Sequence, residues 1–342
     1  MKLIIQIPCL NEEVTLPATI ADLPTHIDGI DSIEVLVIDD GSTDKTLAVA
    51  KGLGVPHVVH HKQNQGLGRA FRTGLEKALE LEADIIVNTD GDGQYAGADI
   101  AKLIGPILAG NVDIVVGARD IAGNTEFTAG KKALQMLGSK VVRYLSGIAI
   151  PDAVSGFRAI SRAAALELNI LSTFSYTTEM LIQAGNKGMR VKSVTVATYP
   201  KTRESRLFRN IPQFIARQLV SMVRMYAMYR PMRFFFYLGS LFFLAGSVPI
   251  VRFLYLYLLN DGAGKVQSLV LGTALLTMGF IVLVAGLLSD LISQNRQLNE
   301  ITLHKLRKLE LKINVQPPLQ DALADASQTN SSTEVTDHAP KP

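Results

Sequence analysis

Two long runs without a charged side chain restrict this chain more than any other feature. Residues 234–251 form an uncharged run of 18 residues, and residues 268–289 form one of 22 residues. About 20 apolar residues cross a bilayer as a helix, and a helix satisfies its own backbone hydrogen bonds there. The sequence therefore predicts a two-helix transmembrane hairpin over residues 234–293, in preference to a buried helical hairpin of a soluble protein.

Basic residues flank both runs and predict an orientation. Residues 201–233 contain eight basic residues and one acidic residue, and Arg296, Lys305, Arg307 and Lys308 follow the second run. Positively charged flanks of membrane helices stay on the cytoplasmic side. We therefore expect a multi-pass protein of the cell (inner) membrane, with its N-terminal part and both termini in the cytoplasm and the short connecting loop outside.

Three further segments follow from composition and spacing. Residues 206–233 have apolar side chains at helical spacing, which predicts an amphipathic helix at the membrane interface, although an ordinary packed helix has the same pattern. Residues 294–314 approach heptad spacing, which predicts a cytoplasmic helix and a possible coiled coil or homo-oligomer contact. Residues 315–342 are rich in Pro, Ser, Thr, Asp and Ala and predict a disordered tail.

Residues 1–205 alternate short apolar runs with segments of helical spacing and form the remaining predicted domain. Five runs read as strands: "KLIIQIP", "IEVLVIDD", "PHVVHH", "DIIVNTD" and "DIVVGAR". Between them lie helical segments, one of which begins near Ser42 and Thr43, residues typical of helix N-caps. This alternation predicts an α/β fold with a mostly parallel, Rossmann-like sheet covered by helices on both faces.

Polar residues follow four of these predicted strands. They are Pro8–Glu13, Asp39–Asp44, Asp90–Gln94 and Arg119–Asp120. Ligands bind beyond the carboxyl ends of the strands in sheets of this kind. Asp, Asn and Gly are also common turn formers, but four such segments, two of them with paired carboxylates, favour one shared site at this edge.

The segment "DGDGQY" carries the strongest chemical signal. Asp90, Asp92 and Gln94 alternate, so in an extended segment their side chains would point the same way. Two carboxylates this close repel each other unless a cation lies between them. Carboxylate and amide oxygens suit a hard divalent ion, and the sequence therefore predicts Mg²⁺ or Mn²⁺ at these three residues, with substrate phosphate completing the coordination.

Composition excludes some other classes. The net charge of +3 is too small to predict a nucleic-acid partner, and the single Cys9 excludes an intrachain disulfide. His57, His60 and His61 lack cysteine or carboxylate partners at zinc-ligand spacing, so we interpret them as polar residues at a strand end.

Several motifs together resemble a known family. In order along the chain, "IPCLNEE", "VIDDGSTD" and "DGDGQY" are similar to motifs of family 2 glycosyltransferases, which have the GT-A fold. "GAR" at 117–119, "SGFRAI" at 155–160 and "RESRL" at 203–207, followed by membrane helices, resemble dolichol-phosphate mannose synthase and the bacterial polyprenyl-phosphate glycosyltransferases. The resemblance covers about residues 1–293. It implies a hexosyltransferase that uses a UDP- or GDP-sugar donor and a polyprenyl phosphate acceptor at the membrane bilayer, with inversion of the anomeric carbon.

The resemblance also implies a role for each matching residue. Nucleotide binding is implied for Pro8, Leu10, Glu12, Asp39 or Asp40, and Asp90. Metal and diphosphate binding is implied for Asp90, Asp92 and Gln94, and phosphate binding for Arg119, Arg203, Ser205 and Arg206. Ser155 and Gly156 would shape the acceptor pocket. Asp92, Arg119, Arg203 and Arg206 are the expected catalytic residues, and Arg206 stands where the family often has lysine.

Three alternatives were compared with this interpretation. A processive polysaccharide synthase shares the fold but carries a Q-x-x-R-W motif, and the chain contains no Trp. A membrane-anchored GT-A transferase acting on another acceptor remains open, although it would not need a basic segment before two membrane helices. A non-catalytic membrane scaffold would leave the carboxylates and arginines without a function.

Overall fold

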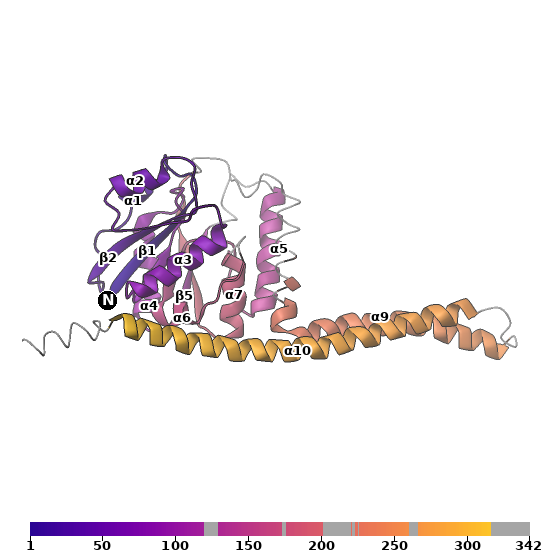
Figure 1. Ribbon diagram of the computed structural model, residues 1–342. Helices are drawn as coiled ribbons and strands as arrows, with labels where there is room; N and C mark the ends of the chain where they lie inside the picture. Colours follow the sequence, from indigo (N-terminus) through magenta and orange to yellow (C-terminus); the bar gives the residue numbers. More distant parts are fainter. Residues whose placement is uncertain are drawn as a thin grey trace, which may run out of the picture. The chain divides into compact units, whose positions relative to one another are not determined.

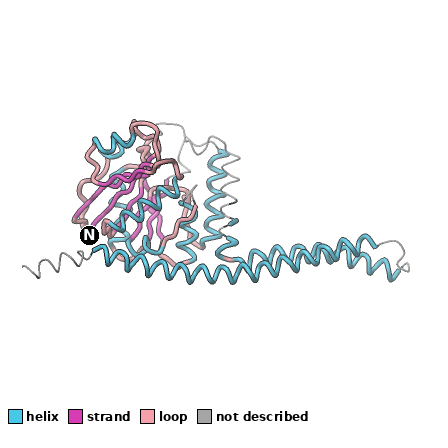
Figure 2. The backbone as a smooth tube through the Cα atoms, in the orientation of Figure 1, coloured by secondary structure: helices cyan, strands magenta, loops and turns pink. Residues whose placement is uncertain are grey.

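The structure is a computed structural model, and it describes residues 1–119, 129–172, 176–200, 220, 223–224, 226–259 and 266–315. Seven strands form one sheet, which lies between helices (Figures 1 and 2). The strands are β1 (Lys2–Cys9), β2 (Ser32–Asp39), β3 (His57–His60), β4 (Ile85–Asn88), β5 (Ile114–Arg119), β6 (Arg158–Ser161) and β7 (Val191–Val196).

The strand order is β3-β2-β1-β4-β6-β5-β7, and only β6 runs against the others. The predicted α/β fold with a mostly parallel sheet is therefore confirmed, and all five predicted strands are present. β6 and β7 were not predicted. β6 inserts between β4 and β5, yet it leaves those two strands parallel to each other, so the carboxyl ends of β1, β2, β4 and β5 lie at one edge of the sheet.

The helices of the N-terminal part cover both faces of the sheet. They are α1 (Leu16–Ala21), α2 (Thr46–Gly52), α3 (Leu67–Glu80), α4 (Ile100–Leu108), α5 (Ala129–Ser146), α6 (Arg162–Glu167) and α7 (Tyr176–Asn186). On one face, Leu16 of α1 and Leu103 of α4 pack in a core with Ile5 of β1. The other face carries α3, whose Phe71 stacks on Tyr176 of α7 with ring centroids 3.8 Å apart.

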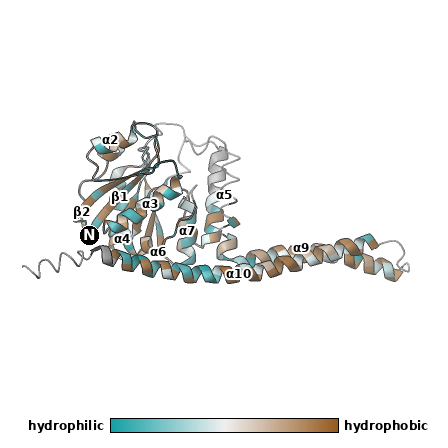
Figure 3. Cartoon of the chain, viewed as in Figure 1, coloured by the Kyte–Doolittle hydropathy of each residue, from teal (hydrophilic) through white to brown (hydrophobic). Residues whose placement is uncertain are grey.

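Two long helices follow, α9 (Pro231–Leu259) and α10 (Val266–Val315). Both are long and apolar enough to cross a membrane. Their most apolar 18-residue windows have mean hydropathies of 1.9 and 2.3. Only 11% and 17% of their most apolar windows are buried, whereas a core helix of a soluble protein would be mostly buried. Figure 3 shows hydrophobic residues along α9 and along the part of α10 beside it. The prediction of two long apolar helices is confirmed.

α9 and α10 approach each other closely at small residues. A Cβ atom added to Gly246 would lie 2.9 Å from the carbonyl oxygen of Gly272. Small residues let two membrane helices come near enough for extensive van der Waals contact. Residues 294–314 continue α10 without a break, and the interface helix expected over residues 206–233 falls mostly outside the described residues, as does the expected tail.

Arg158 of β6 is the largest fully buried side chain in the sheet. Its guanidinium donates to three backbone carbonyl oxygens, those of Ser155 at 2.9 Å, Ala153 at 2.8 Å and Thr177 at 2.7 Å. It also lies 5.8 Å from the centroid of the Tyr176 ring. A buried charge is tolerated only when its donors are satisfied, and here they join the chain before β6 to the start of α7.

Replacement of this side chain predicts a large loss of stability. Arg158→Met removes every donor and leaves three buried carbonyl oxygens without a partner, at a cost of about 3 kcal/mol or more. For a domain of this size we expect the midpoint of thermal unfolding to fall by roughly 6 °C or more. Arg69→Met, at an exposed position of α3, is the matched control and should shift the midpoint little. A midpoint of Arg158→Met equal to that of the control would contradict the prediction.

Candidate active site

The loop after β4 presents the two carboxylates but not in the expected conformation. The segment from Asp90 to Gln94 is a turn rather than an extended strand, with Gly93 at φ +68°. Asp92 accepts hydrogen bonds from the backbone N–H of Gln94 at 3.2 Å and from its Nε2 at 2.7 Å. The argument from alternation in an extended segment is therefore wrong. The turn brings Gln94 back onto Asp92.

Asp90 lies in a crowded electrostatic environment. Its side chain is half-buried. Loss of hydration and the neighbouring Asp92 carboxylate raise the pKa of Asp90 to about 7, with a further increase from Glu12, while Arg119 and Arg158 act in the opposite direction. Loss of hydration and the nearby carboxylates together outweigh the two arginines, so the site favours an additional proton or cation at Asp90.

Arg119, at the end of β5, is held by a carboxylate that follows α5. Its Nε donates to Asp152 Oδ2 at 2.7 Å and its Nη2 donates to Asp152 Oδ1 at 3.1 Å, so the pair is bidentate. Asp152 is fully buried, whereas the Arg119 side chain is 18% exposed. Such a pair fixes the plane of the guanidinium. The sequence did not predict this partner for Arg119.

The turn before β6 lies against Asp90. A Cβ atom added to Gly156 would lie 2.8 Å from Asp90 Oδ1 and 2.9 Å from Asp90 Oδ2. A side chain at position 156 would fit only if the Asp90 carboxylate shifted. The neighbouring Ser155 is fully buried, and its hydroxyl lies 3.4 Å from the Tyr95 hydroxyl and accepts from the backbone N–H of Phe157 at 3.3 Å.

A buried polar network holds this turn in place. Gln6 Nε2 donates to Asn88 Oδ1 at 2.9 Å, and Asn88 Nδ2 lies 2.9 Å from the Gly156 carbonyl oxygen and 2.8 Å from the Tyr176 hydroxyl oxygen. The Tyr176 hydroxyl donates to the same carbonyl at 3.0 Å. Asn88 and Tyr176 were missed in the sequence. Asn88 ends β4 just before the carboxylate loop, and that position was the available signal.

The ends of β1 and β2 meet the carboxylate loop at Cys9. This thiol is buried, and burial, Glu12, Asp39 and Asp90 together raise its pKa well above the usual value. Three carboxylates that are far apart in the sequence therefore act on one atom, which supports the expected convergence of strand ends. Pro8 is buried in β1, Leu10 is partly exposed in the loop that follows, and Glu12 is buried there.

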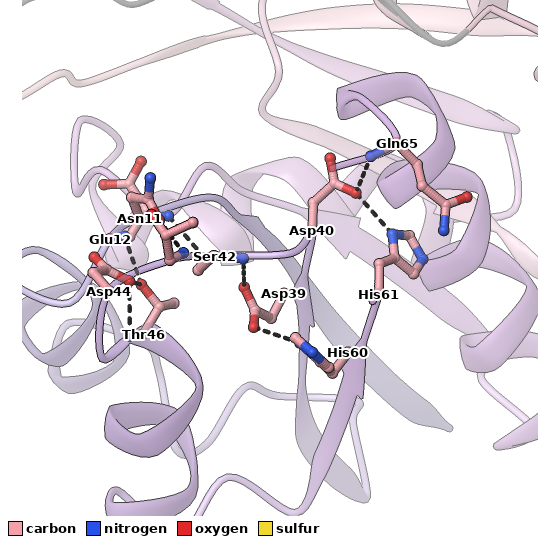
Figure 4. A network of polar contacts seen from close by, with 11 residues as sticks. Asn11, Glu12, Asp39, Asp40, Ser42, Asp44, Thr46, His60, His61 and Gln65 are labelled. Carbon is pink, nitrogen blue, oxygen red and sulfur yellow. Dashed lines mark hydrogen bonds and ion pairs between the residues drawn. The ribbon is translucent and has the colours of Figure 1, made fainter. Parts of the chain in front are cut away.

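Asp39 and Asp40 make contacts that organise the chain after β2 (Figure 4). Asp39 accepts from the Ser42 N–H at 3.1 Å and pairs with His60 Nδ1 at 2.8 Å. Asp40 pairs with His61 Nδ1 at 2.8 Å and accepts from the N–H groups of Gln65 and Gly66, both at 2.9 Å. Both histidines thus have carboxylate partners. Asp40 ties the start of α3 to the sheet, and the expected nucleotide contact of Asp39 or Asp40 stays a prediction.

The expected N-cap at Ser42 and Thr43 is wrong. α2 begins at Thr46, and the two residues bind the neighbouring loop instead: Asn11 N–H donates to Ser42 Oγ at 2.8 Å, and Thr43 N–H donates to Asn11 Oδ1 at 2.7 Å. Thr46 Oγ1 accepts from the Glu12 N–H at 2.8 Å. These contacts couple the loops after β1 and β2, as Figure 4 also shows.

The remaining predicted residues can be placed only in part. Arg203, Ser205 and Arg206 lie outside the described residues, as does Asp120. In the described parts of the chain, the structure brings together Glu12, Asp39, Asp90, Arg119 and Gly156.

The carboxylate loop has the donor set of a cation site that substrate completes. No group of three His, Cys, Asp or Glu side chains within the described ranges is arranged to hold a metal alone. Mg²⁺ usually takes one or two protein carboxylates and fills its other positions with water and substrate phosphate. Asp90 and Asp92 supply that number, and loss of hydration together with the Asp92 carboxylate raises the pKa of Asp90. The residues present fit a divalent ion.

Comparison with known proteins gives the family of the chain. The model of the family "Glycosyl transferase family 2" matches residues 4–168. The chain is 34% identical over 217 residues to a UDP-N-acetylglucosamine–dolichyl-phosphate N-acetylglucosaminyltransferase of Methanococcus voltae, covering 56% of this chain and 83% of the relative. It is 27% identical over 206 residues to a polyprenol monophosphomannose synthase of Mycolicibacterium smegmatis, covering 57% and 76% respectively.

A solved structure has the same fold. Glucosyl-3-phosphoglycerate synthase from Mycobacterium tuberculosis, crystallised with phosphoglyceric acid, superimposes with a TM-score of 0.52 and 22% identity, covering 66% of this chain and 79% of that one. The protein is thus an enzyme of the glycosyltransferase class with a GT-A-like fold. It belongs to glycosyl transferase family 2.

The raised pKa of Asp90 predicts a pH-dependent stability. The native state holds a proton that the unfolded chain releases, so the stabilising contribution is complete below the ordinary aspartate pKa and is lost as the pH rises to about 7. In a metal-free buffer we expect the thermal midpoint of wild type to be lower at about pH 8 than at about pH 5, and Asp90→Asn to reduce that difference by a few degrees. The control is Asp28→Asn, at an exposed position. An unchanged pH dependence in Asp90→Asn would contradict the assignment.

Substitution of Gly156 should affect function more than stability. The methyl group of Gly156→Ala would occupy space within 3 Å of both Asp90 oxygens, and the carboxylate must then shift from its present position. We expect sugar transfer to fall roughly 10-fold or more, because small displacements of catalytic groups are costly, with a change in thermal midpoint of only a few degrees. Gly105→Ala, where an added Cβ meets no atom within 4 Å, is the control. Wild-type transfer in Gly156→Ala would show that the contact is unimportant.

Proposed function

We propose that the enzyme transfers a sugar from a nucleotide-sugar donor, UDP- or GDP-linked, to a polyprenyl phosphate at the cytoplasmic face of the membrane, with inversion at the anomeric carbon. The names of two relatives support the acceptor, since one acts on dolichyl phosphate and the other is a polyprenol monophosphomannose synthase. The apolar helices α9 and α10 support a lipid acceptor over a soluble one.

The donor side of the site is assigned to the carboxylate loop. Asp90 and Asp92 would hold Mg²⁺ or Mn²⁺, with Gln94 orienting Asp92 through its hydrogen bonds. When bound, the ion would neutralise charge on the departing diphosphate. Pro8, Leu10, Glu12 and Asp39 surround the ends of β1 and β2, where the nucleotide would lie.

The acceptor side is assigned to the opposite flank of Asp90. Asp152 orients the Arg119 guanidinium, which would bind a phosphate of either substrate. Ser155 and Gly156 form the buried turn beside Asp90 and would shape the space for the acceptor. Arg203, Ser205 and Arg206 are proposed to bind the lipid phosphate.

The chemistry requires alignment more than proton transfer. A polyprenyl phosphate is an anion at neutral pH, so its oxygen attacks the anomeric carbon without a strong general base. One bond forms to the phosphate oxygen as the bond to the diphosphate breaks, and a single displacement inverts the configuration. The chain contributes by bringing two anionic substrates together, which fixed guanidinium groups favour.

The orientation in the membrane follows from the positively charged flanks. Arg224, Arg230 and Arg233 precede the first apolar run, and Arg296 follows the second. This distribution supports a cytoplasmic location for the glycosyltransferase domain and for both termini. The observation that carries the proposal is the convergence of Asp90, Arg119 and Gly156 at one sheet edge in a chain with two apolar helices.

Transfer into lipid tests the proposal. Membranes containing the protein would be incubated with undecaprenyl phosphate, Mn²⁺ and a panel of radiolabelled UDP- and GDP-sugars, and the lipid extract counted. We expect label from one donor in the extract and a loss of roughly 100-fold or more in Asp92→Asn, because the charge stabilisation of the leaving group is removed. Omission of divalent ions should have the same effect.

The matched control and a soluble acceptor make the result decisive. Asp28→Asn removes an exposed carboxylate and should retain full transfer. Undiminished transfer in Asp92→Asn would refute the metal assignment. Label on a soluble phosphate such as 3-phosphoglycerate, with none in lipid, would refute the acceptor. Unchanged lipid transfer in Arg203→Ala and Arg206→Ala would remove those residues from the site.

A further inference from the structure

A second polar pocket lies where α9 begins, away from the carboxylate loop. Its volume is about 240 Å³, and its lining includes Tyr229, Arg230, Arg233, Asp290, Gln294 and Gln297. At about 30 Å³ per water molecule this is room for roughly eight waters. The pocket is thus large enough for a phosphate group and a short polar substituent.

The pocket is at the level where both apolar helices reach the membrane surface. The first apolar run starts at Phe234 and the second ends at Ser289. These ends are paired, because a Cβ atom on Gly286 would lie 2.6 Å from Phe235 Cβ, and Ser293 Oγ donates to the Met228 carbonyl at 2.9 Å. Lipid head groups occupy this level of a bilayer.

The pocket contains charges of both signs. Arg230 and Arg233 contribute two guanidinium groups, and Asp290 contributes a carboxylate. The salt bridges of this region, among the described residues, join Glu300 to Arg296 at 3.1 Å and to Lys187 at 3.0 Å, and none joins Asp290 to Arg230 or Arg233. Arg230, Arg233 and Asp290 therefore line one pocket, and Asp290 is not paired with either arginine.

The neighbouring Arg296, which is not among the lining residues, already has an anionic partner. The guanidinium carbon of Arg296 lies 4.0 Å from the centroid of the Tyr229 ring, and Arg296 pairs with Glu300. Asp290 accepts one hydrogen bond from Gln294 Nε2 at 3.0 Å, and a carboxylate can accept about four. A ligand in the pocket would meet the two arginines and Asp290, whose carboxylate can accept further hydrogen bonds.

This arrangement differs from general membrane anchoring. Arginines that only hold a helix in the bilayer need a basic flank and no partner of opposite sign. A carboxylate in the same cavity weakens the attraction to any anionic lipid, but it provides an acceptor for a donor carried by the head group itself. The mixed charge therefore favours a head group that carries both a phosphate and a hydrogen-bond donor, and not every lipid with a negative charge.

We propose that this pocket binds the head group of a bilayer amino-phospholipid. Arg230 and Arg233 take the phosphodiester, and Asp290 accepts from the primary ammonium group, with Gln297 at the rim. A polyprenyl phosphate lacks the donor, and its terminal phosphate would bring additional negative charge toward Asp290. A choline head group lacks an N–H. The site is independent of the acceptor assigned above and anchors the start of α9 to a specific lipid.

Lipid competition tests this proposal. The detergent-purified full-length protein would be mixed with equal amounts of dioleoyl phosphatidylethanolamine, phosphatidylcholine and phosphatidylglycerol, and retained lipids identified by native mass spectrometry. We expect wild type to retain phosphatidylethanolamine roughly tenfold over phosphatidylcholine, the ratio that one charge-assisted hydrogen bond provides. Asp290→Asn should lower this ratio toward unity, Asp290→Glu should keep part of it, and Arg233→Gln should weaken retention of both lipids.

The control removes the same kind of charge outside the pocket. Lys305→Gln with Lys308→Gln changes exposed basic residues of α10 and should leave the lipid preference unchanged. Equal retention of the two zwitterionic lipids by wild type would overturn the proposal, and so would a preference for phosphatidylglycerol, which indicates net charge alone. Stronger retention of undecaprenyl phosphate in a second competition would assign the pocket to the acceptor instead. These wild-type measurements decide the question even if a variant fails to fold.

Discussion

The crowded, partly dehydrated position of the Asp90 carboxylate is the constraint on which the site depends. Loss of hydration and the neighbouring Asp92, with a smaller effect of Glu12, raise the pKa of Asp90 to about 7, and Arg119 and Arg158 offset this only in part. Such crowding is unfavourable for the ionised carboxylates, and a salt bridge or the replacement of one carboxylate would relieve it. Here the two arginines are committed elsewhere: Arg119 to Asp152, and Arg158 to three backbone carbonyls. Under the proposed function, a divalent cation that also binds the donor diphosphate would relieve this crowding.

The surroundings of Asp90 are held by buried polar groups rather than by apolar packing alone. Asn88 and Tyr176 both bond the Gly156 carbonyl, and Tyr176 also stacks on Phe71. Satisfied buried networks are rigid because each member has a defined partner. The turn beside Asp90 is therefore positioned by β4, α3 and α7 together. This rigidity suits an enzyme that aligns two anions and performs little proton transfer.

The two long apolar helices are also held by a few specific contacts. The two apolar helices pack through small residues, and charged residues gather only where the apolar runs end. Arg296 and Glu300 of α10 contact Tyr229 and Lys187, so this part of α10 is joined to the residues before α9 and to the end of α7. A head-group site at this level would couple the protein to the composition of the bilayer.

Patterns that act locally could be predicted from the sequence. The five apolar runs became β1 to β5, the uncharged runs became α9 and α10, and the glycosyltransferase family followed from motifs at strand ends. These signals are local, because the burial of a strand or of an apolar helix determines the residue types at consecutive positions. The sequence alone did not predict β6 and β7, the turn that joins Gln94 to Asp92, or the partners of Asp40 and Asp152. Those features depend on residues distant in the chain, such as His61 and Arg119. Only the folded sheet brings such groups within hydrogen-bonding distance, so the tertiary structure decided which partner each of these carboxylates has.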